Sequence, residues 1–238
     1  MLNSCLLILA GGFGTRLRSV VFDRPKPLAP VGGIPFLQFL LEQWKAQGIR
    51  NYVFLLHHQA EQVVAWLHTL EATLLDSCTY SVVIEPQPLN TGGAVAYAVQ
   101  QLALQGDFLV ANADTWLGTG VSSIKLTTPP ALSVIRVDDT SRYGSVLFNN
   151  IGNVTAFNEK QDSIGTGWIN AGLYHLMSDD FSDWEGQPFS LEQDWFPTLV
   201  RTGRLKAVPL QTTFIDIGIP EDYQRFKQWI ESGKSFIL

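Results

Sequence analysis

The 238-residue sequence predicts an α/β fold built on a mixed, mostly parallel sheet with helices on both faces. Two observations carry this prediction. Residues 5–10 form a continuous apolar run that ends in a cluster of glycines, which is the pattern of a buried parallel strand and the loop after it. Beyond this run, strand-like stretches alternate with stretches whose apolar residues recur every three or four positions. In such a sheet, ligands bind at the carboxyl ends of the strands.

In the first half of the chain, helix and strand signals follow one another in order. Residues 36–44 have apolar side chains at helical spacing, with Pro35 at the helix start and Gly48 as its C-terminal cap. Residues 85–94 contain two prolines and two glycines, and we expect them to form a rigid loop that opens a helix. The full set of expected elements is a helix at 36–47, a strand at 49–56, a helix at 60–70, a strand at 80–85, a helix that ends near 104 and a strand at 107–111.

From about residue 117 the pattern changes to short strands separated by turns, which favours antiparallel strands. We expect these strands at 131–137, 143–148, 154–157 and 168–175, then a helix at 190–202, a strand at 205–210 and a final helix that begins at Pro220. The length suits one large domain or two small ones, and the resemblance described below covers nearly the whole chain. We therefore expect a single domain over 1–238, with one half at 1–116 and the other at 117–238.

Charge and composition exclude several classes of function. The net charge is −6 and there is no basic stripe, which argues against a nucleic-acid partner. No apolar stretch has membrane-spanning length and the first residues lack the basic start of a signal peptide, so we expect a cytoplasmic protein without a membrane partner. Cys5 and Cys78 cannot form a disulfide framework, and the four histidines show no metal-ligand spacing. The oligomeric state stays open, a homo-oligomer included.

The strongest functional signal is the glycine-rich stretch at the end of the first strand. Gly11, Gly12 and Gly14 let the backbone turn sharply and bring its N–H groups close to an anion. Arg16 adds a fixed positive charge, and Lys26 adds a second one held between two prolines. The stretch lacks the last glycine of a dinucleotide fingerprint and the Gly-Lys-Ser/Thr of a P-loop. It therefore predicts a phosphate-binding loop of another kind.

The run Gly-Gly-x-Gly-Thr-Arg-Leu at 11–17, followed by Pro-Lys-Pro at 25–27, resembles the sugar-phosphate nucleotidyltransferases. Four further stretches extend the resemblance over nearly the whole chain, namely Arg-Tyr-Gly at 142–144, Glu-Lys at 159–160, Asn-Ala-Gly at 170–172 and Asp-Ile-Gly-x-Pro at 216–220. The resemblance implies a three-layer Rossmann-like nucleotidyltransferase fold. It also implies an enzyme that takes a nucleoside triphosphate and a sugar 1-phosphate, makes a nucleotide sugar and releases pyrophosphate.

The resemblance further implies a role for individual residues. Catalytic roles fall to Arg16, Lys26 and Asp114, and a Mg²⁺ site falls to Asp114 and Asp216. The nucleotide-binding positions are Leu9, Gly11, Gly12, Gly14, Thr15, Glu85, Asn90 and Thr91. The sugar-phosphate-binding positions are Gly144, Glu159, Lys160 and Asn170. From the residues alone, Asp216 has a second interpretation, in which it only caps the final helix.

The implied reaction is an in-line attack by an oxygen of the sugar phosphate on the α-phosphorus of the triphosphate. This nucleophile is already ionised at neutral pH, so no general base is needed, and the sequence shows no obvious histidine or cysteine catalyst. The rate enhancement must then come from positioning the two substrates and from neutralising the charge of their phosphates. The resemblance gives the pyrophosphate to Arg16 and the loop amides, and it gives the sugar phosphate to Lys160.

Three positions depart from the usual pattern of the family. Asn90 and Ala113 stand where relatives have glycine, and Ile34 stands where many relatives have lysine or arginine. Asparagine is one of the few other residues that tolerate a left-handed backbone, and alanine fits wherever φ stays negative. We therefore expect the loops to be kept, while the loss of a cation at Ile34 points to a different sugar phosphate or a weaker grip on it.

Two arguments narrow the choice of nucleoside triphosphate and of sugar 1-phosphate. Glu85 falls at the base-binding position, where a carboxylate accepts the N1–H and N2 amino donors of guanine and repels the carbonyl oxygens of uracil or thymine. The stretches at 24–30, 88–93, 142–144 and 216–223 resemble in particular the guanylyltransferases of the family that use a manno-heptose 1-phosphate. Mannose 1-phosphate as the acceptor, and UTP or dTTP as the donor, remain alternatives.

A rival of a different class is a binding module that senses a nucleotide sugar without making it. Such a degenerate copy should have lost some of the charged residues that the reaction needs. Arg16, Lys26, Asp114 and Asp216 are all present, which favours the enzyme.

Overall fold

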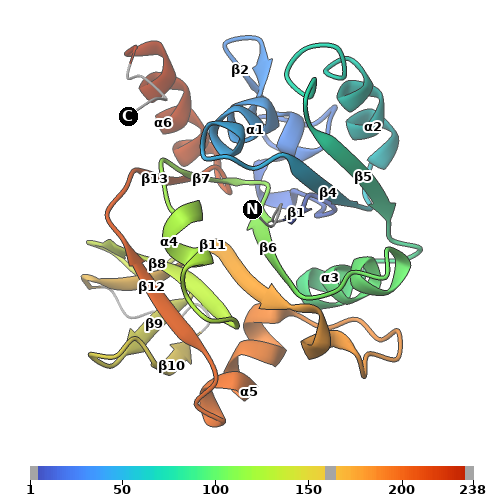
Figure 1. The fold of residues 1–238 in the computed structure, drawn as a ribbon. Helices are drawn as coiled ribbons and strands as arrows, with labels where there is room; N and C mark the ends of the chain where they lie inside the picture. The colour runs from blue at the N-terminus through green and yellow to red at the C-terminus, as the bar shows by residue number, and fades with distance from the viewer. Residues whose placement is uncertain (1–4, 159–164, 234–238) are drawn as a thin grey trace. The chain divides into compact units, whose positions relative to one another are not determined.

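The structure is a computed structural model that describes residues 5–158 and 165–233, so the expected sites at Glu159 and Lys160 lie outside the described residues. The chain divides into two compact units that exchange segments along the sequence (Figure 1). Unit 1 comprises residues 1–87, 111–118 and 213–238, and unit 2 comprises 88–110 and 119–212. The expected halves, 1–116 and 117–238, therefore differ from these units in three segments: residues 88–110 belong to unit 2, whereas residues 117–118 and 213–238, with Asp216, belong to unit 1.

Unit 1 is an α/β unit with a parallel set of strands. β1 pairs with β4 and β4 pairs with β5, both in parallel, as the alternation of strand and helix patterns predicts. Its elements are β1 (Cys5–Leu9), η1 (Thr15–Leu17), η2 (Lys26–Leu28), β2 (Pro30–Val31), β3 (Ile34–Pro35), α1 (Phe36–Ala46), β4 (Asn51–Leu56), α2 (Ala60–His68), β5 (Thr79–Ile84), β7 (Thr115–Leu117), β13 (Phe214–Asp216) and α6 (Pro220–Glu231). β6 (Asp107–Asn112) begins in unit 2 and ends in unit 1.

The C-terminal helix α6 packs into the core of unit 1 through aromatic rings. Phe226 is fully buried, and its ring centroid lies 4.8 Å from that of Phe36 in α1 and 5.7 Å from that of Trp116 in β7. Burying a side chain of this size contributes about 1.5–3 kcal/mol to folding. Pro220 begins the helix, as predicted. The packing anchors the last segment of the chain beside β7, which matters for the site described below.

Unit 2 is a mixed, mostly antiparallel assembly, as the short strands of the second half predict. β8 pairs in antiparallel fashion with β11 and in parallel with β12, while β9 pairs antiparallel with β10 and β11. Besides most of β6, its elements are α3 (Asn90–Gln101), α4 (Val121–Lys125), β8 (Ala131–Val137), β9 (Ser145–Phe148), β10 (Val154–Asn158), β11 (Gly167–Met177), η3 (Ser178–Phe181), η4 (Leu191–Trp195), α5 (Phe196–Arg201) and β12 (Lys206–Leu210).

Two elements differ from the sequence-based expectation. The glycines at 92 and 93 lie in the first turn of α3 and not in the loop before it, because that helix already begins at Asn90. The single helix expected at 190–202 is a π-helical turn, η4, followed by the short α5. Sequence periodicity does not distinguish a π-turn from an α-helix, since both place apolar residues on one face. Within the described ranges, no helix is both long and apolar enough to span a bilayer.

Candidate active site

The loop after β1 uses each of its three glycines for a different reason. Gly14 has a left-handed φ of 59°, and an added Cβ there would lie 3.1 Å from the Cβ of Lys26. At Gly11, an added Cβ would lie 2.9 Å from Glu85 Oε1 and 3.0 Å from the backbone nitrogen of His57. At Gly12, an added Cβ would meet no atom within 4 Å. The loop is thus tightly packed at two positions and open at the third.

Lys26 lies between the two aspartates that the sequence places about a hundred residues apart. Its Nζ donates a hydrogen bond of 2.5 Å to Asp114 Oδ2 and lies 4.0 Å from Asp216 Oδ1. The lysine side chain is only 10% exposed, so this charge lies in a partly desolvated site. The hydroxyl of Thr115 also donates to Asp114, over 3.2 Å. The structure therefore brings Lys26, Asp114 and Asp216 together, as the sequence predicted.

Backbone pairing sets the position of the two aspartates. The backbone nitrogen of Ala113 donates to the carbonyl oxygen of Leu9 at the end of β1, over 3.2 Å, which ties Asp114 to the glycine loop. β13 pairs with β7 in antiparallel register, with Asp216 opposite Thr115. The backbone nitrogen of Ile217 completes the link by donating to the carbonyl oxygen of Asp114 over 2.9 Å.

Asp216 does not cap the final helix. Its Oδ1 accepts a hydrogen bond of 2.6 Å from the backbone nitrogen of Gly218, whereas the N-cap residue of α6 is Ile219, with no side-chain cap. An added Cβ at Gly218 would lie 2.8 Å from Asp216 Oδ1, so glycine is required for this close approach. The interpretation of Asp216 as a helix cap is therefore wrong.

The two carboxyl groups respond differently to their shared environment. For Asp114, burial favours the protonated form, but the charge and hydrogen bond of Lys26, helped by Thr115 and Arg16, lower its pKa below the usual range. For Asp216, burial and then the neighbouring charge of Asp114 raise the pKa to about 6. A carboxylate that is costly to ionise beside another carboxylate marks a place that favours a cation.

A cavity of about 190 Å³ lies beside this cluster. It is lined by Leu9, Ala10, Gly12, Gly14, Thr15, Arg16, Lys26, Pro27, Ala113, Asp114 and Gly218. The open face of Gly12 and the exposed Arg16 border the same space as the Lys26–Asp114 pair. Ala113 is buried and is not among the described residues with positive φ, so alanine fits where relatives have glycine.

The pair of aspartates suits a hard divalent cation. Mg²⁺ prefers carboxylate oxygens and is usually held by one or two of them, with substrate phosphates and water completing its shell. Among the described residues, no group of three or more histidine, cysteine, aspartate or glutamate side chains is arranged to hold a metal. The donor set therefore fits a metal that binds together with phosphate, and it does not fit a structural metal cage.

Glu85 follows β5 and lies against the first glycine of the loop. Its side chain is 8% exposed, and its Oε1 is the atom that an added Cβ at Gly11 would approach most closely. The Nδ1 atom of His57 donates to the carbonyl oxygen of Glu85 over 3.2 Å. The expected base-binding carboxylate is thus buried at the edge of the glycine loop.

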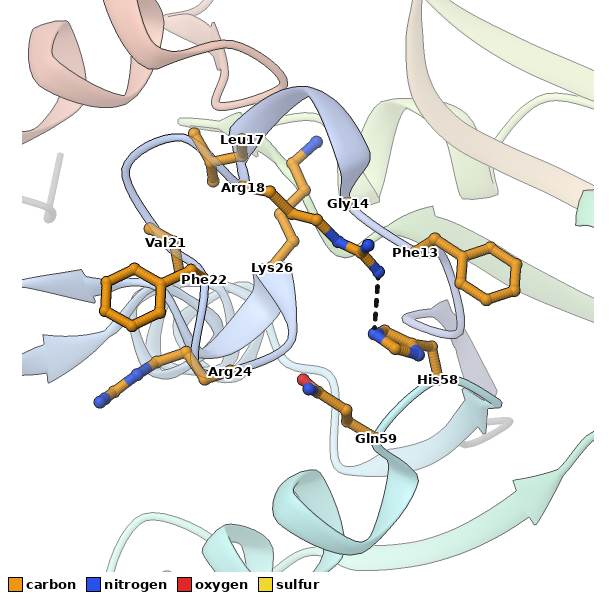
Figure 2. A pocket seen from close by; sticks show the side chains of 10 residues that line it. All are labelled: Phe13, Gly14, Leu17, Arg18, Val21, Phe22, Arg24, Lys26, His58 and Gln59. Atoms are coloured by element: carbon orange, nitrogen blue, oxygen red, sulfur yellow. Dashed lines mark hydrogen bonds between the residues drawn. The ribbon is translucent and has the colours of Figure 1, made fainter.

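A second cavity, of about 250 Å³, lies on the other side of the Gly14–Lys26 contact (Figure 2). Arg18 donates to His58 Nε2 across it over 3.3 Å, and Gln59 and Arg24 also line it. In Figure 2 the terminal nitrogen of Lys26 points away from the guanidinium of Arg18. The first cavity is the one that Arg16 and the Lys26–Asp114 pair line together.

The expected nucleotide-loop residues of unit 2 are held by local contacts. Asn90 has a φ of 59°, which confirms the left-handed backbone predicted for it. The hydroxyl of Thr91 donates to Glu192 Oε2 over 2.6 Å and accepts from the backbone nitrogen of Leu191 over 2.9 Å. Phe189 packs on Gly92, where an added Cβ would lie 2.2 Å from its ring.

The described sugar-side residues lie on neighbouring strands of unit 2. The backbone nitrogen of Asn170 in β11 donates to the carbonyl oxygen of Gly144 over 2.9 Å. The Asn170 side chain contacts Tyr174, which in turn contacts Glu192. Sequence reasoning gave these last two residues no role, because Tyr174 only ends the stretch at 169–174 that resembles the family and Glu192 matches no motif. One signal that could have drawn attention to Glu192 is its place in the first turn of the expected helix, two residues after the capping residue Ser190.

Comparison with known proteins adds to this geometry. The model of the nucleotidyl transferase family matches residues 6–233. A D-glycero-α-D-manno-heptose 1-phosphate guanylyltransferase of Campylobacter jejuni is 34% identical over 221 residues, which cover 92% of this chain and 97% of that protein. Mannose-1-phosphate guanylyltransferase 1 of Arabidopsis thaliana is 33% identical over 231 residues, and here the matched region covers 91% of this chain but only 62% of that protein.

Solved structures agree with the sequence matches. The crystal structure of HddC from Yersinia pseudotuberculosis matches with a TM-score of 0.83 and 35% identity, over 95% of this chain and 99% of its own. A second structure of HddC, in complex with GMP-PN, matches with a TM-score of 0.82 and 34% identity over the same shares of the two chains. The chain therefore belongs to the nucleotidyl transferase family, and the α/β class and the enzymatic nature predicted from its sequence are confirmed.

Proposed function

We propose that this enzyme transfers a guanylyl group from GTP to a sugar 1-phosphate, with a manno-heptose 1-phosphate as the acceptor, and releases pyrophosphate. The observation that carries the proposal is the Nζ of Lys26, which lies between Asp114 and Asp216 beside the open face of the glycine loop. The relatives support the choice of substrates, since one is named a heptose 1-phosphate guanylyltransferase and another was solved with GMP-PN.

The glycine loop and Arg16 bind the departing pyrophosphate in this proposal. The backbone at Gly12 has free space beside it, so a phosphate can approach its N–H group without a steric clash. Arg16 lines the same cavity and is exposed, which leaves its guanidinium able to form a paired contact with phosphate oxygens. These contacts exist before and after the transfer, so they act on nucleotide affinity as well as on rate.

Asp114 and Asp216 hold Mg²⁺ in this proposal. A bound Mg²⁺ supplies charge neutralisation at the α-phosphate, which lowers the cost of bringing a second anion to it. Among the described residues, Lys26 is the ion-pair partner of both carboxylates, and the charge of Arg16 acts on them from farther away. With a cation on the carboxylates, the ammonium of Lys26 is available to the phosphate on which negative charge grows during transfer.

The acceptor side of the proposal uses Gly144, Glu159, Lys160 and Asn170. The sugar phosphate is itself an ionised nucleophile, so these residues need to position it and do not need to remove a proton. We further propose that, within one domain, residues 1–116 bind the nucleotide and residues 117–238 bind the sugar phosphate. Asp216 is the exception, since it lies in the second half of the sequence but acts on the nucleotide side.

Glu85 sets the preference for guanine. Its carboxylate borders the glycine loop and can accept two adjacent donors from a guanine edge, whereas uracil presents one donor flanked by carbonyl oxygens. A bidentate contact of this kind is worth about 1–3 kcal/mol of discrimination between bases.

The proposal is tested by a matrix of donors and acceptors, scored by pyrophosphate release. GTP, ATP, CTP, UTP and dTTP are each combined with D-glycero-α-D-manno-heptose 1-phosphate, mannose 1-phosphate and glucose 1-phosphate, in the natural enzyme and in Glu85→Gln. We expect the highest kcat/KM for GTP with the heptose phosphate, and a GTP-to-UTP ratio that falls about tenfold in Glu85→Gln. A natural preference for UTP or dTTP, or a ratio unchanged by the substitution, would contradict the assignment of the base.

A further inference from the structure

The side chain of Glu192 joins two segments of unit 2 that carry expected substrate contacts. Its Oε1 accepts a hydrogen bond of 3.0 Å from the hydroxyl of Tyr174 in β11. Its Oε2 accepts one of 2.6 Å from Thr91 in α3 and one of 3.0 Å from Ser190. Within the described residues no ion pair includes Glu192, so three neutral hydroxyl groups solvate this half-buried carboxylate.

On the β11 side, this contact fixes the orientation of the Asn170 amide. Since the Tyr174 hydroxyl gives its proton to Glu192, it accepts from Asn170 Nδ2, over 2.9 Å. Asn170 Oδ1 accepts from the backbone nitrogen of Gly172 over 3.1 Å. Each end of the amide is therefore tied to one partner. One N–H of Nδ2 and one lone pair of Oδ1 remain for a ligand.

The backbone of β11 is irregular at the same place. The pairing of β11 with β8 shifts register between Asn170 and Tyr174, and Gly172 between them has a left-handed φ of 72°. A bulge of this kind redirects a side chain out of the regular alternation of a strand, and bulges are frequent next to active sites. The bulge aims the Asn170 side chain, and the Tyr174–Glu192 pair keeps it there.

On the α3 side, Glu192 belongs to the π-helical turn η4. Ser190 Oγ accepts from the backbone nitrogens of Glu192 and Gln193 at the start of this turn, which caps it. The hydroxyl of Thr91 donates its proton to Glu192 Oε2 and accepts a hydrogen bond from the backbone nitrogen of Leu191. Thr91 therefore acts by fixing the first turn of α3, and its hydroxyl proton is not available to a nucleotide. Single π-turns are often found at functional sites.

We infer that Glu192 and Tyr174 are positioning residues for the sugar-phosphate acceptor, and that they act by holding the Asn170 amide in one orientation. A sugar hydroxyl both donates and accepts, which matches the one N–H and one lone pair that Asn170 keeps. The inference rests on the proposed function, since it assumes that Asn170 contacts the acceptor. It adds a specificity element that no motif in the sequence marks.

The test compares Tyr174→Phe and Glu192→Gln with two matched controls in the same unit, Tyr97→Phe in α3 and Glu185→Gln, whose side chains lie outside this network. We expect each network variant to raise the KM for the acceptor about fivefold or more, the effect of losing one hydrogen bond of about 1 kcal/mol. The KM for GTP should stay within twofold in Tyr174→Phe, which leaves the bond between Thr91 and Glu192 in place, and the controls should change neither constant.

A second readout follows Asn170 itself in the ligand-free protein. The side-chain amide signals of Asn170 are identified by NMR through their loss in Asn170→Asp. We expect them to move, and their proton exchange to quicken, in Tyr174→Phe and Glu192→Gln but not in the controls. This readout also covers the case in which a network variant is too unstable for kinetics, because the other variant still reports on the amide.

The outcomes separate the inference from the proposed function. A natural enzyme that turns over no sugar 1-phosphate would overturn the proposed function and the inference with it. An active natural enzyme whose network variants change both KM values by the same factor, or leave the Asn170 signals in place, would overturn the inference alone. A selective rise in the acceptor KM with displaced Asn170 signals would support it.

Discussion

Gly12 of the loop in unit 1 and Gly92 at the start of α3 in unit 2 both belong to glycine clusters in the sequence, but their surroundings are opposite. An added Cβ at Gly12 would meet no atom within 4 Å, whereas one at Gly92 would lie 2.2 Å from Cε2 of Phe189. The space beside Gly12 is open to a ligand, and the space beside Gly92 is already filled by a ring. A glycine cluster in a sequence therefore indicates that another group comes close to the backbone. Only the structure shows whether there is space for a ligand or whether a side chain already fills it.

The charged side chains of the two regions differ in the same way. Beside the open loop, a lysine lies between two aspartates, and the pKa of Asp216 is raised to about 6, so these charges are not fully balanced by the protein. Beside the filled glycines, Glu192 accepts three hydrogen bonds from hydroxyl groups. The first region is therefore prepared for charged ligands and their chemistry. The second is prepared to hold side chains in place.

The largest effect is expected from removing a charge of the first region. Replacing Asp114 or Asp216 by Asn should lower kcat/KM by about 10²-fold or more, because each change removes a negatively charged ligand of Mg²⁺ worth several kcal/mol at the transition state. Both variants should still fold. The measurement is pyrophosphate release in saturating Mg²⁺, with Asp183→Asn as a control on an exposed carboxylate. Near-normal turnover in either variant would contradict the division between the regions.

Within the first region, we expect Lys26 and Arg16 to act on different kinetic constants. Lys26→Ala should reduce kcat by about 10²-fold with little change in KM, since Lys26 meets charge that develops during the transfer. Arg16→Ala should raise the KM for GTP as well as lower kcat, because a guanidinium also binds the phosphates of the ground state. Steady-state kinetics on both variants, with the exposed Lys125→Ala as a control, measure this. A Lys26→Ala enzyme with normal kcat and a raised KM would reverse the two roles.

The sequence indicated which residues of the first region lie together, because the signal consists of residue types at fixed spacing. Three glycines after an apolar strand, an arginine and a lysine between prolines need no tertiary information to suggest a phosphate site. The pairing of Asp114 with Asp216 came from the resemblance to a family, and the structure explains it by the register of β7 with β13. No local pattern in the sequence encodes that register.

The second region was predicted less well for a physical reason. The contacts of Asn170, Tyr174 and Glu192 depend on a bulge in β11 and on a π-turn at η4, and both are small deviations from a regular period. The glycines before Ala94 were expected to shape a loop, but they lie within α3 because Phe189 packs on them. Tertiary packing of this kind is not readable from composition or periodicity.

The two glycines themselves give the next largest effect. Gly92→Ala should destabilise unit 2 by about 1–3 kcal/mol, because its Cβ overlaps the ring of Phe189. Gly12→Ala should leave stability unchanged, since its Cβ meets open space, yet weaken GTP binding where the phosphate approaches the backbone. Denaturant unfolding and GTP affinity, measured on both variants, decide this. A Gly12→Ala protein that loses stability and keeps its affinity for GTP would contradict the comparison.

A separate effect, on stability alone, is a pH dependence of the metal-free protein. Because the pKa of Asp216 is raised to about 6, the folded state keeps a proton that the unfolded chain loses near pH 4. The contribution of Asp216 to stability is therefore present below pH 4 and is lost as the pH rises to about 6, by on the order of 3 kcal/mol. The difference in unfolding free energy between the natural protein and Asp216→Asn, measured with a chelator, should follow this course. A difference independent of pH would show that folding does not shift the pKa of Asp216.

The most direct test of the assignment is the binding of Mn²⁺, as a substitute for Mg²⁺, in the presence of a non-hydrolysable GTP analogue. Electron paramagnetic resonance counts the free ion in the natural protein, in Asp114→Asn, in Asp216→Asn and in the double variant. The account predicts one bound ion per chain, an affinity at least about tenfold weaker in each single variant, and little further loss in the double variant, because both carboxylates hold the same ion. Unchanged affinity in Asp216→Asn would contradict it and would leave Asp216 with its contacts to the backbone of Gly218 and to Lys26.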